Sequence, residues 1–581
     1  MKENKTKRHA RLRELYEAAK LRYAEVLTEL SQSMEQYNGS DKIDGSAERA
    51  VTVRNITYEL IEAEVSSEIP VPKADPCRYS LQNDRNARSI ERLLYRIRDE
   101  LPFERMNDFD ERYTYIYGAG IWLLEWTEDR EDGGVRILSV SPEDFIPQPD
   151  VWSLEDMDYC FFRFPTTRAE LCRKYRISEA EAANAVSDGY AENESCVTAV
   201  VCFYKDEDGE VGRYVFSGDV TLSDDPDYYS RRREVCEACG CERGVCTCEQ
   251  PRYAWQSELS ECLTQDLLLS DGRVLPAATP EVDGLGRLTG RQIPTEIPYY
   301  KPRRFPVVIR RNISRVKALY GQSDAAAIRP EQQAINKVES RIMQKLMRAG
   351  ITPMVPEDAA ISVNNAVFGQ VVRLRPGEDS SAYGVIDTTP NISQDIAEAE
   401  RLYDHARRVL GITDTFQGLS DTTAQSGVAK QVQIAQAAGR LESKRRMKHA
   451  AYAELDRLIF EFYLAFADLP RPVTYKDADG VTRAAEFNRY DFLIFDEESC
   501  TYRYDDGYLF SIDQNGGIES QRESMWRQNL ENLRAGTLGD PTSPATLLHY
   551  WQCQERAHYP YARENVEYFR QLTERKEIDA E

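Results

Sequence analysis

The chain has 581 residues, of which 41% are hydrophobic, and its 74 lysines and arginines against 98 aspartates and glutamates give a formal net charge of −24. This length predicts three or four domains with apolar cores, and the acidic balance excludes general adhesion to nucleic acid, because a sequence-independent phosphate binder needs a basic face. The longest apolar runs, 118–126 and 458–466, are far shorter than the roughly 20 residues of a membrane span, so the sequence predicts no membrane segment.

The first 110 residues have the pattern of helices. Apolar residues recur at steps of three and four from Leu12 to Leu30, and residues 89–101 repeat that spacing. The N-terminus is charged and lacks the apolar core and small-residue cleavage site of a secretion signal. We therefore expect the chain to stay in the cytoplasm, with its 13 cysteines reduced.

Residues 111–205 alternate between strand and helix patterns, as in an α/β domain. The apolar runs 120–126 and 133–141 flank an acidic turn that ends in glycine, which is a hairpin signal, and 197–205 reads as a further strand. The next segment, 206–294, has a different composition, with paired acids, many glycines and a cysteine cluster. This difference predicts an acidic, cysteine-rich insertion.

Five cysteines of this insertion lie within thirteen residues: Cys236, Cys239, Cys241, Cys246 and Cys248. Four thiolates on tight turns bind zinc tetrahedrally, and such a site would fold a segment that has little apolar core of its own. We predict a structural zinc ion held by Cys236, Cys239, Cys246 and Cys248, with Cys241 spare or substituting. Reduced thiols in a disordered loop, a disulfide and another metal are the alternatives.

A helix with one row of cations follows the insertion. The extended segment 295–322 leads into it, and the helix pattern covers 323–349, with an apolar stripe of Ile335, Val338, Ile342, Leu346 and Ala349. Lys337, Arg341 and Lys345 stand at i, i+4 and i+8 on another face, with Arg348 beside them. Residues 301–350 hold twelve cations against three acids, so this window carries +9 and the remainder −33.

The second half of the chain alternates again between short strands and long helices. Its parts are short strands and turns at 350–392, a helix at 393–410 with Ser393 as its N-cap, a small-residue loop at 411–426, a very long helix at 427–468, strands at 469–516 and helices at 517–581. The whole pattern predicts an α+β fold.

The order of these elements resembles the portal proteins of tailed double-stranded DNA bacteriophages, the head-tail connectors at the capsid vertex. Residues 305–342 are similar to the segment that enters the first stem helix of portals. Residues 418–436 are similar to the tunnel loop and the helix after it, and 118–126 with 141–175 resemble the wing. The resemblance therefore extends over the elements in their order along the chain.

The resemblance implies a portal-like ring subunit. Its parts would be an α/β wing at 111–205 with an N-terminal helical part at 1–110, the insertion at 206–294, an extended segment at 295–322, stem helix 1 at 323–349, a small α/β clip at 350–392, stem helix 2 at 393–410, the tunnel loop at 411–426, a long kinked helix at 427–468, returning wing strands at 469–516 and a helical crown at 517–581.

The resemblance also implies a function and partners. It implies a ring of twelve subunits in the virion, assembled in the host cytoplasm, through which double-stranded DNA is packaged and ejected. The implied partners are the terminase large subunit, the major capsid and scaffolding proteins, and a head-completion or adaptor protein, with no membrane contact.

Two charged features fit such a ring. The cationic row could be a solvated face paired with acids, a face toward the acids of a neighbouring subunit, with Glu398, Glu400 and Asp404 as candidates, or a face toward DNA. The tunnel-loop candidates are Asp414, Gly418, Asp421, Thr422 and Thr423. The two acids there would keep the grip on moving DNA weak, and ordinary solvent-exposed acids are the alternative.

The sequence contains no G-x-x-x-x-G-K-[ST] phosphate loop, no H-E-x-x-H and no G-x-S-x-G. We therefore predict that the chain is not an enzyme and has no catalytic residues. Two rivals remain, a zinc-dependent nucleic-acid-processing or nucleic-acid-binding protein that uses the cysteine cluster, and a monomeric cytoplasmic adaptor built on the long helices.

Overall fold

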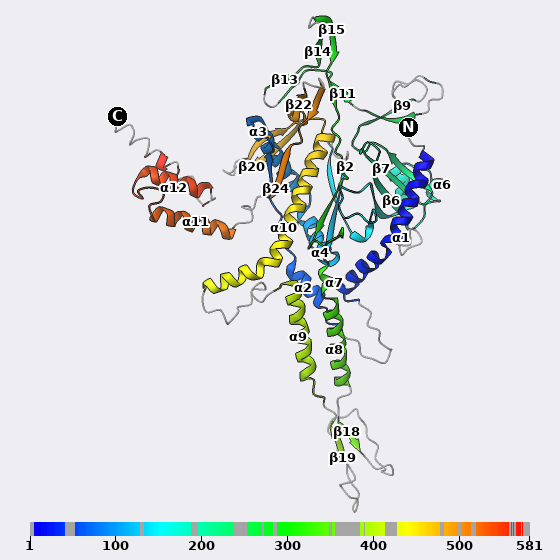
Figure 1. Ribbon diagram of the computed structural model, residues 1–581, viewed down its shortest axis with the longest axis vertical. Helices are drawn as coiled ribbons and strands as arrows, with labels where there is room; N and C mark the ends of the chain where they lie inside the picture. The colour runs from blue at the N-terminus through cyan, green and yellow to red at the C-terminus, as the bar shows by residue number, and fades with distance from the viewer. Residues whose placement is uncertain are drawn as a thin grey trace, which may run out of the picture. The chain divides into compact units, whose positions relative to one another are not determined.

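The computed structural model shows an α+β protein, which confirms the predicted class (Figure 1). The chain forms two compact units, Met1–Ser67 with Arg92–Asp506, and Glu68–Glu91 with Gly507–Glu581. The structure describes residues 5–40, 53–127, 133–187, 196–236, 248, 253–347, 351–354, 384–387, 390–412, 427–476, 482–496, 501–512, 519–556 and scattered later residues, with gaps at 79, 259, 270–271 and 283–287. No helix in these ranges is long and apolar enough to cross a bilayer.

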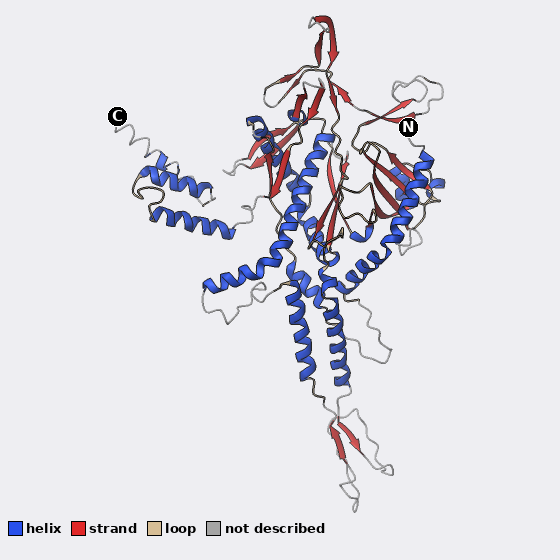
Figure 2. Cartoon of the chain, in the orientation of Figure 1, coloured by secondary structure: helices blue, strands red, loops and turns tan. Residues whose placement is uncertain are grey.

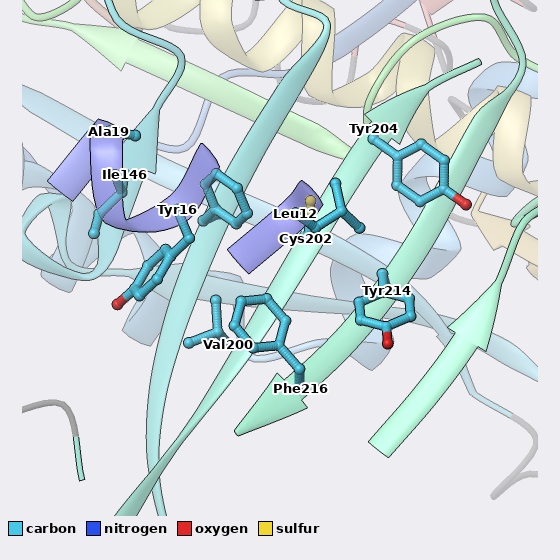
Figure 3. Packing of buried hydrophobic residues seen from close by; sticks show 10 residues of the cluster. Leu12, Tyr16, Ala19, Ile146, Val200, Cys202, Tyr204, Tyr214 and Phe216 are labelled. Atoms are coloured by element: carbon cyan, nitrogen blue, oxygen red, sulfur yellow. The ribbon is translucent and has the colours of Figure 1, made fainter. Parts of the chain in front are cut away.

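A five-stranded antiparallel sheet forms one core of the first unit. Its order is β4 (Phe145–Pro147), β5 (Tyr159–Thr167), β6 (Cys196–Lys205), β7 (Val211–Ser217) and β8 (Val220–Asp225). Alternate residues of these strands, such as Val200 and Cys202, share one face because successive side chains point to opposite faces. Helix α1 (Lys5–Tyr37) covers that face with Leu12, Tyr16 and Ala19 (Figure 3).

A second sheet has the order β17 (Val307–Arg311), β2 (Ala119–Thr127) and β3 (Gly134–Val140). The antiparallel pairing of β2 with β3 confirms the predicted hairpin. Helix α4 (Phe103–Tyr117) precedes β2 and ends at Gly118, whose φ of 87° favours glycine. A Cβ at Gly118 would overlap the backbone of Gly321, and one at Gly120 would overlap Asp110. Gly118 therefore permits a close backbone crossing, and Gly120 leaves room for the Asp110 side chain.

The segment that the sequence assigns to the stem is a helical hairpin. It contains α7 (Asp324–Ala327), α8 (Arg329–Met347), the antiparallel pair β18 (Ile351–Met354) and β19 (Gly384–Asp387), and α9 (Ser393–Leu410). Figure 2 shows α8 and α9 side by side, and residues along both helices are in contact. Of the other residues predicted as the clip, 390–392 are described and 350, 355–383 and 388–389 lie outside the described ranges.

Two helix starts differ from the sequence prediction. The helix predicted at 323–349 is interrupted at Ile328. Its first part is the separate short helix α7, which Ser323 caps; the Ser323 hydroxyl accepts a hydrogen bond from the Ala326 N–H (3.0 Å). The bounds of α9 match the prediction, but its N-cap is Ile392. Ser393 is the first helical residue, and its N–H donates to Asn391 Oδ1 (3.0 Å).

Helix α10 (Gly427–Phe466) is one helix of 40 residues, with a bend along its length in Figure 1. It packs on β17 and β2, where Tyr452 meets Trp122 edge to face at 5.0 Å. The remaining helices of this unit are α2 (Ile56–Glu64), α5 (Arg168–Tyr175), α6 (Glu179–Ala182), η1 (Pro142–Asp144) and η3 (Arg489–Phe492). Two hairpins come after α10, namely β20 (Arg471–Lys476) with β21 (Thr482–Phe487) and β22 (Leu493–Asp496) with β23 (Thr501–Tyr504).

The predicted insertion at 206–294 begins too early. Strands β7 and β8 belong to the five-stranded sheet, because β7 pairs with β6 over Val200–Lys205. Beyond β8 the chain forms four short pairs: β9 (Arg232–Cys236) with β10 (Tyr253–Ser257), β11 (Ser260–Cys262) with β16 (Glu296–Pro298), β12 (Leu267–Leu268) with β13 (Val274–Leu275), and β14 (Ala278–Val282) with β15 (Leu288–Pro294). Leu269 and Leu275 share a core cluster with Tyr490.

The second unit is small. Its strands β1 (Pro72–Pro76) and β24 (Tyr508–Ile512) pair antiparallel, and its helices are α11 (Glu519–Arg534) and α12 (Pro544–Arg556). Helix α3 (Leu81–Glu100) begins in this unit and its last part belongs to the first. The sequence analysis read residues 1–110 as helices and missed β1, because its partner lies more than 400 residues away in the chain.

Candidate functional site

The main apolar cluster of the α8–α9 hairpin lies at its base, and Val338 and Ala399 are buried further along. Ile335, Ala406 and Leu410 are buried at the base with Ile56 and Leu60 of α2 and with Ile328 and Ile412. The predicted apolar stripe of α8 does not stay buried, since Ile342 is half-buried and Leu346 is 47% exposed. Ala349 lies outside the described residues.

The cationic row of α8 finds a partner within the same chain. Arg341 Nη2 lies 2.7 Å from Asp395 Oδ1, and Lys345 binds the other oxygen of the same carboxylate. The hydrogen bond from Lys345 lowers the pKa of Asp395, which is buried at the start of α9. Lys337 is exposed, and Arg348 lies outside the described residues. The sequence analysis did not single out Asp395.

The three acids predicted as partners from a neighbouring subunit each have a cation nearby in their own chain. Glu398 binds Arg401 at 2.6 Å, Glu400 binds Arg54 at 2.9 Å, and Asp404 lies 4.0 Å from Arg407. Glu398, Glu400 and Asp404 lie at the surface, where ion pairs contribute little to folding. Contacts between subunits stay a prediction.

A set of buried charges holds α10 against the base of the hairpin. Lys444 Nζ lies 2.6 Å from Glu64 Oε2 of α2 and 2.8 Å from Asp324 Oδ2 of α7. All three side chains are at most 5% exposed. Burial, and then the charge of Asp324, raise the pKa of Glu64 to about 8, against the attraction of Lys444.

One turn further along α10, Lys448 binds a second buried set. Its Nζ lies 2.8 Å from Glu111 Oε1, and Arg310 Nη1 lies 2.8 Å from the same oxygen. Arg310 reaches Asp110 as well. Burial raises the pKa of Asp110 to about 6, because it outweighs the attraction of Arg310. Burial lowers the pKa of Lys448.

The buried row continues along α10 at the same spacing. The Tyr452 hydroxyl donates to Asn107 Oδ1 at 3.1 Å, and Asp456 accepts from Arg98 Nη2 at 2.7 and 2.8 Å. Residues 444, 448, 452 and 456 therefore form one polar face of α10 at i, i+4, i+8 and i+12. Sequence reasoning missed this face, because Lys444, Lys448 and Asp456 stand among the many other charged residues of 440–457 and their spacing does not mark them as buried.

The two described cysteines of the predicted zinc site lie close together. Cys236 ends β9 and is buried, and its Sγ lies 3.9 Å from Sγ of Cys248. Two thiolates bound tetrahedrally at about 2.3 Å from zinc are roughly 3.8 Å apart, so this separation fits two ligands of one ion. Cys239, Cys241 and Cys246 lie outside the described residues, within which no three His, Cys, Asp and Glu side chains are grouped to hold a metal.

The predicted tunnel-loop residues Asp414, Gly418, Asp421, Thr422 and Thr423 lie outside the described residues. The structure describes only the two residues that open this segment. Gly411 ends α9 in the left-handed conformation, with φ of 85°, and its N–H donates to Arg407 O at 2.9 Å. Ile412 is buried in the cluster at the base of the hairpin. The segment thus starts from a fixed point.

No protein-family model matches the chain, and no curated protein matches it. The residues themselves therefore carry the functional argument. In the described part of the chain, these residues connect helices to one another. A helical hairpin and the long helix α10 are joined to one base through apolar contacts and buried ion pairs.

Proposed function

We propose that this chain is the subunit of a phage portal, a ring of twelve copies at the capsid vertex through which double-stranded DNA is packaged and ejected. The observation that carries the proposal is the order of elements around the hairpin. Helix α8 leads through the pair β18–β19 back to α9, and residues 413–426 then connect α9 to the 40-residue α10. The portal resemblance assigns the same order to stem, clip, second stem helix, tunnel loop and long helix.

The charge of the chain supports a conduit for DNA. A basic tunnel would hold the phosphates through counterion release and would slow the moving duplex. A chain with a net charge of −24 would bind the phosphates only weakly. We assign 411–426 to the tunnel loop, where Asp414 and Asp421 would face the duplex and keep its binding weak.

The proposed partners correspond to this role. The clip would dock the terminase large subunit during packaging and a head-completion or adaptor protein afterwards, and the wing would meet the major capsid and scaffolding proteins. The chain itself would turn over no nucleotide, since its sequence holds no phosphate loop. It would be assembled in the host cytoplasm and remain in the virion.

The cysteine cluster has a separate, structural role in this proposal. We infer one zinc ion per chain, held by Cys236 and Cys248 with Cys239 and Cys246, with Cys241 spare or substituting. The 3.9 Å separation of the two described sulfurs supports it. Metal analysis after reducing purification without a chelator should find about one zinc per chain, and Cys236→Ser should lose it. If the protein contains no metal, the zinc site is wrong and the cysteines are either disulfide-bonded or reduced.

Negative-stain images of the purified chain test the ring directly. Rings with a central hole are expected. A uniform monomer would contradict the portal and favour the adaptor, and a zinc-dependent nuclease activity in that monomer would favour the nucleic-acid-processing alternative. Absence of ATP turnover by the pure rings is the accompanying expectation.

A further inference from the structure

The distal half of the α8–α9 hairpin buries little apolar surface, namely Ala399 and part of Ile342. Between the helices stands the buried Asp395 with its two cations, Arg341 and Lys345. The large apolar side chains point outward instead, with exposed fractions of 42% for Met343, 47% for Leu346, 71% for Met347 and 47% for Ile396. Two helices that bury so little against each other are marginal in water, so this half of the hairpin needs a covering surface.

The helical period divides the hairpin into two flanks. We call one the acidic flank; Arg54 marks it by reaching both Glu339 of α8 (3.9 Å) and Glu400 of α9 (2.9 Å). The other is the basic flank, where Arg341 lies near Glu398 of α9. At 100° per residue the four exposed apolar side chains fall on the acidic flank: Met343, Leu346, Met347 and Ile396.

The flanks carry opposite charge. Around Asp395, the basic flank carries the cations Lys337, Arg341, Lys345 and Arg401 and the acids Asp395 and Glu398. The acidic flank carries the acids Glu339 and Glu400, and Glu59, which accepts a hydrogen bond from Tyr403. Its cations are Arg54 and Arg407, which both lie over the Tyr403 ring. A surface whose two sides complement each other suits a head-to-tail contact between identical chains.

We propose that the hairpins of two copies dock side by side, with the basic flank of one on the acidic flank of the next. The long stems of Lys337, Arg341 and Arg401 would cover Met343, Leu346, Met347 and Ile396, while their charged ends face the acids. Lysine and arginine stems cover apolar surface in this way. This inference rests on the proposed ring, and it names the surface that joins neighbouring subunits.

A second copy is the favoured occupant because both halves of the contact lie on one hairpin. A foreign partner would explain one flank and leave the opposite charge of the other without a role. The exposed pairs contribute only about 0 to 1 kcal/mol each. Burial of the four apolar side chains is therefore the main attraction, and the charges fix the orientation.

The test is the variant Met343→Lys with Met347→Lys, in the full chain. Both side chains are exposed, so the fold should tolerate the change, and circular-dichroism melting should match the parent protein. New cations on the acidic flank would face the basic flank of the neighbour. We expect the subunit concentration for half-assembly, measured by sedimentation and negative stain, to rise at least about tenfold.

Two matched variants complete the test. Leu268→Lys with Val274→Lys adds the same charge at exposed positions of β12 and β13, and should leave rings intact. Adding Lys337→Glu to the double-lysine variant should restore part of the assembly. Unchanged assembly of the double-lysine variant, or equal loss in the control, overturns the docking surface while the ring stands. A monomeric parent protein overturns both the ring and this contact.

Discussion

Two helices of this molecule carry rows of cations at the same spacing, but one row is exposed to solvent and the other is buried. On α8, Lys337 is exposed and the Arg341 side chain is 54% exposed. On α10, Lys444 and Lys448 are 4% and 5% exposed. The spacing places each row on one helix face in both cases. The two rows differ in the acids that pack against them. Glu64, Asp324 and Glu111, which come from distant segments of the chain, enclose the α10 row.

The difference separates two roles for charge. A buried ammonium must be paired, because a charge without a partner in the interior is costly. The α10 row therefore joins three segments, α2, α7 and α4, to one helix. The α8 row stays in water, where ion pairs contribute little to folding and remain available to another chain. Substitutions in each row can test this separation.

Replacing Lys444 by Ala should have the largest effect. It leaves the carboxyl groups of Glu64 and Asp324 buried without their cation, and breaking a buried pair costs about 3–5 kcal/mol. Urea unfolding followed by tryptophan fluorescence measures it, because Trp122 packs against Tyr452 of α10. An unfolding midpoint equal to that of the parent protein would contradict the assignment.

A triple variant separates charge from packing at this site. Lys444→Met with Glu64→Gln and Asp324→Asn removes the ammonium and both carboxyl groups while keeping similar volumes. Replacement of a whole buried ion set is often neutral, so most of the lost stability should return. If it does not, the packing of the Lys444 side chain, and not its pairing, holds α10 in place.

The stability of this region should fall as pH rises. Burial, and then the charge of Asp324, raise the pKa of Glu64 from 4.5 to about 8. Between these values the folded chain holds a proton that the unfolded chain releases, so the stabilisation is complete below about pH 4.5 and declines up to about pH 8. Burial also raises the pKa of Asp456 to about 6, which adds the same sign at lower pH.

Glu64→Gln isolates this dependence, because the amide stays neutral at every pH. We expect the variant to match the parent protein at about pH 4, where Glu64 is protonated in both states, and to exceed its stability at about pH 9. Urea titrations at both values are the measurement. Parallel pH curves for variant and parent would show that Glu64 is not the titrating group.

Local patterns predicted the elements well where the signals were strong. Helix α9 occupies Ser393–Leu410 as expected, since Gly411 ends it in the left-handed conformation. Strand β6 and the β2–β3 hairpin were also predicted, because their apolar runs are bounded by turns. Long-range pairing was not visible. Strand β1 contains two prolines and depends on β24, far along the chain.

The candidate site shows the same limit. The sequence found the exposed row on α8 and offered Glu398, Glu400 and Asp404 of a neighbouring subunit as candidate partners, which stays a prediction. It did not single out Asp395, which binds the row within the chain. It missed the α10 row, because helical period gives the face and not its burial. Burial is decided by which segments fold against the helix. That information lies in the tertiary contacts of α2, α4 and α7.

The smallest effect on folding is expected on the exposed row. The variant Lys337→Ala with Arg341→Ala should change the free energy of unfolding by no more than about 0.5 kcal/mol, because surface substitutions rarely do more. Its assembly should weaken nonetheless, and it should lose part of its salt dependence, since the screened charges are gone. Urea unfolding and sedimentation at two salt concentrations measure the two quantities on the same samples. A loss of stability close to that of Lys444→Ala would mean that both rows serve folding, and the distinction between them would fall.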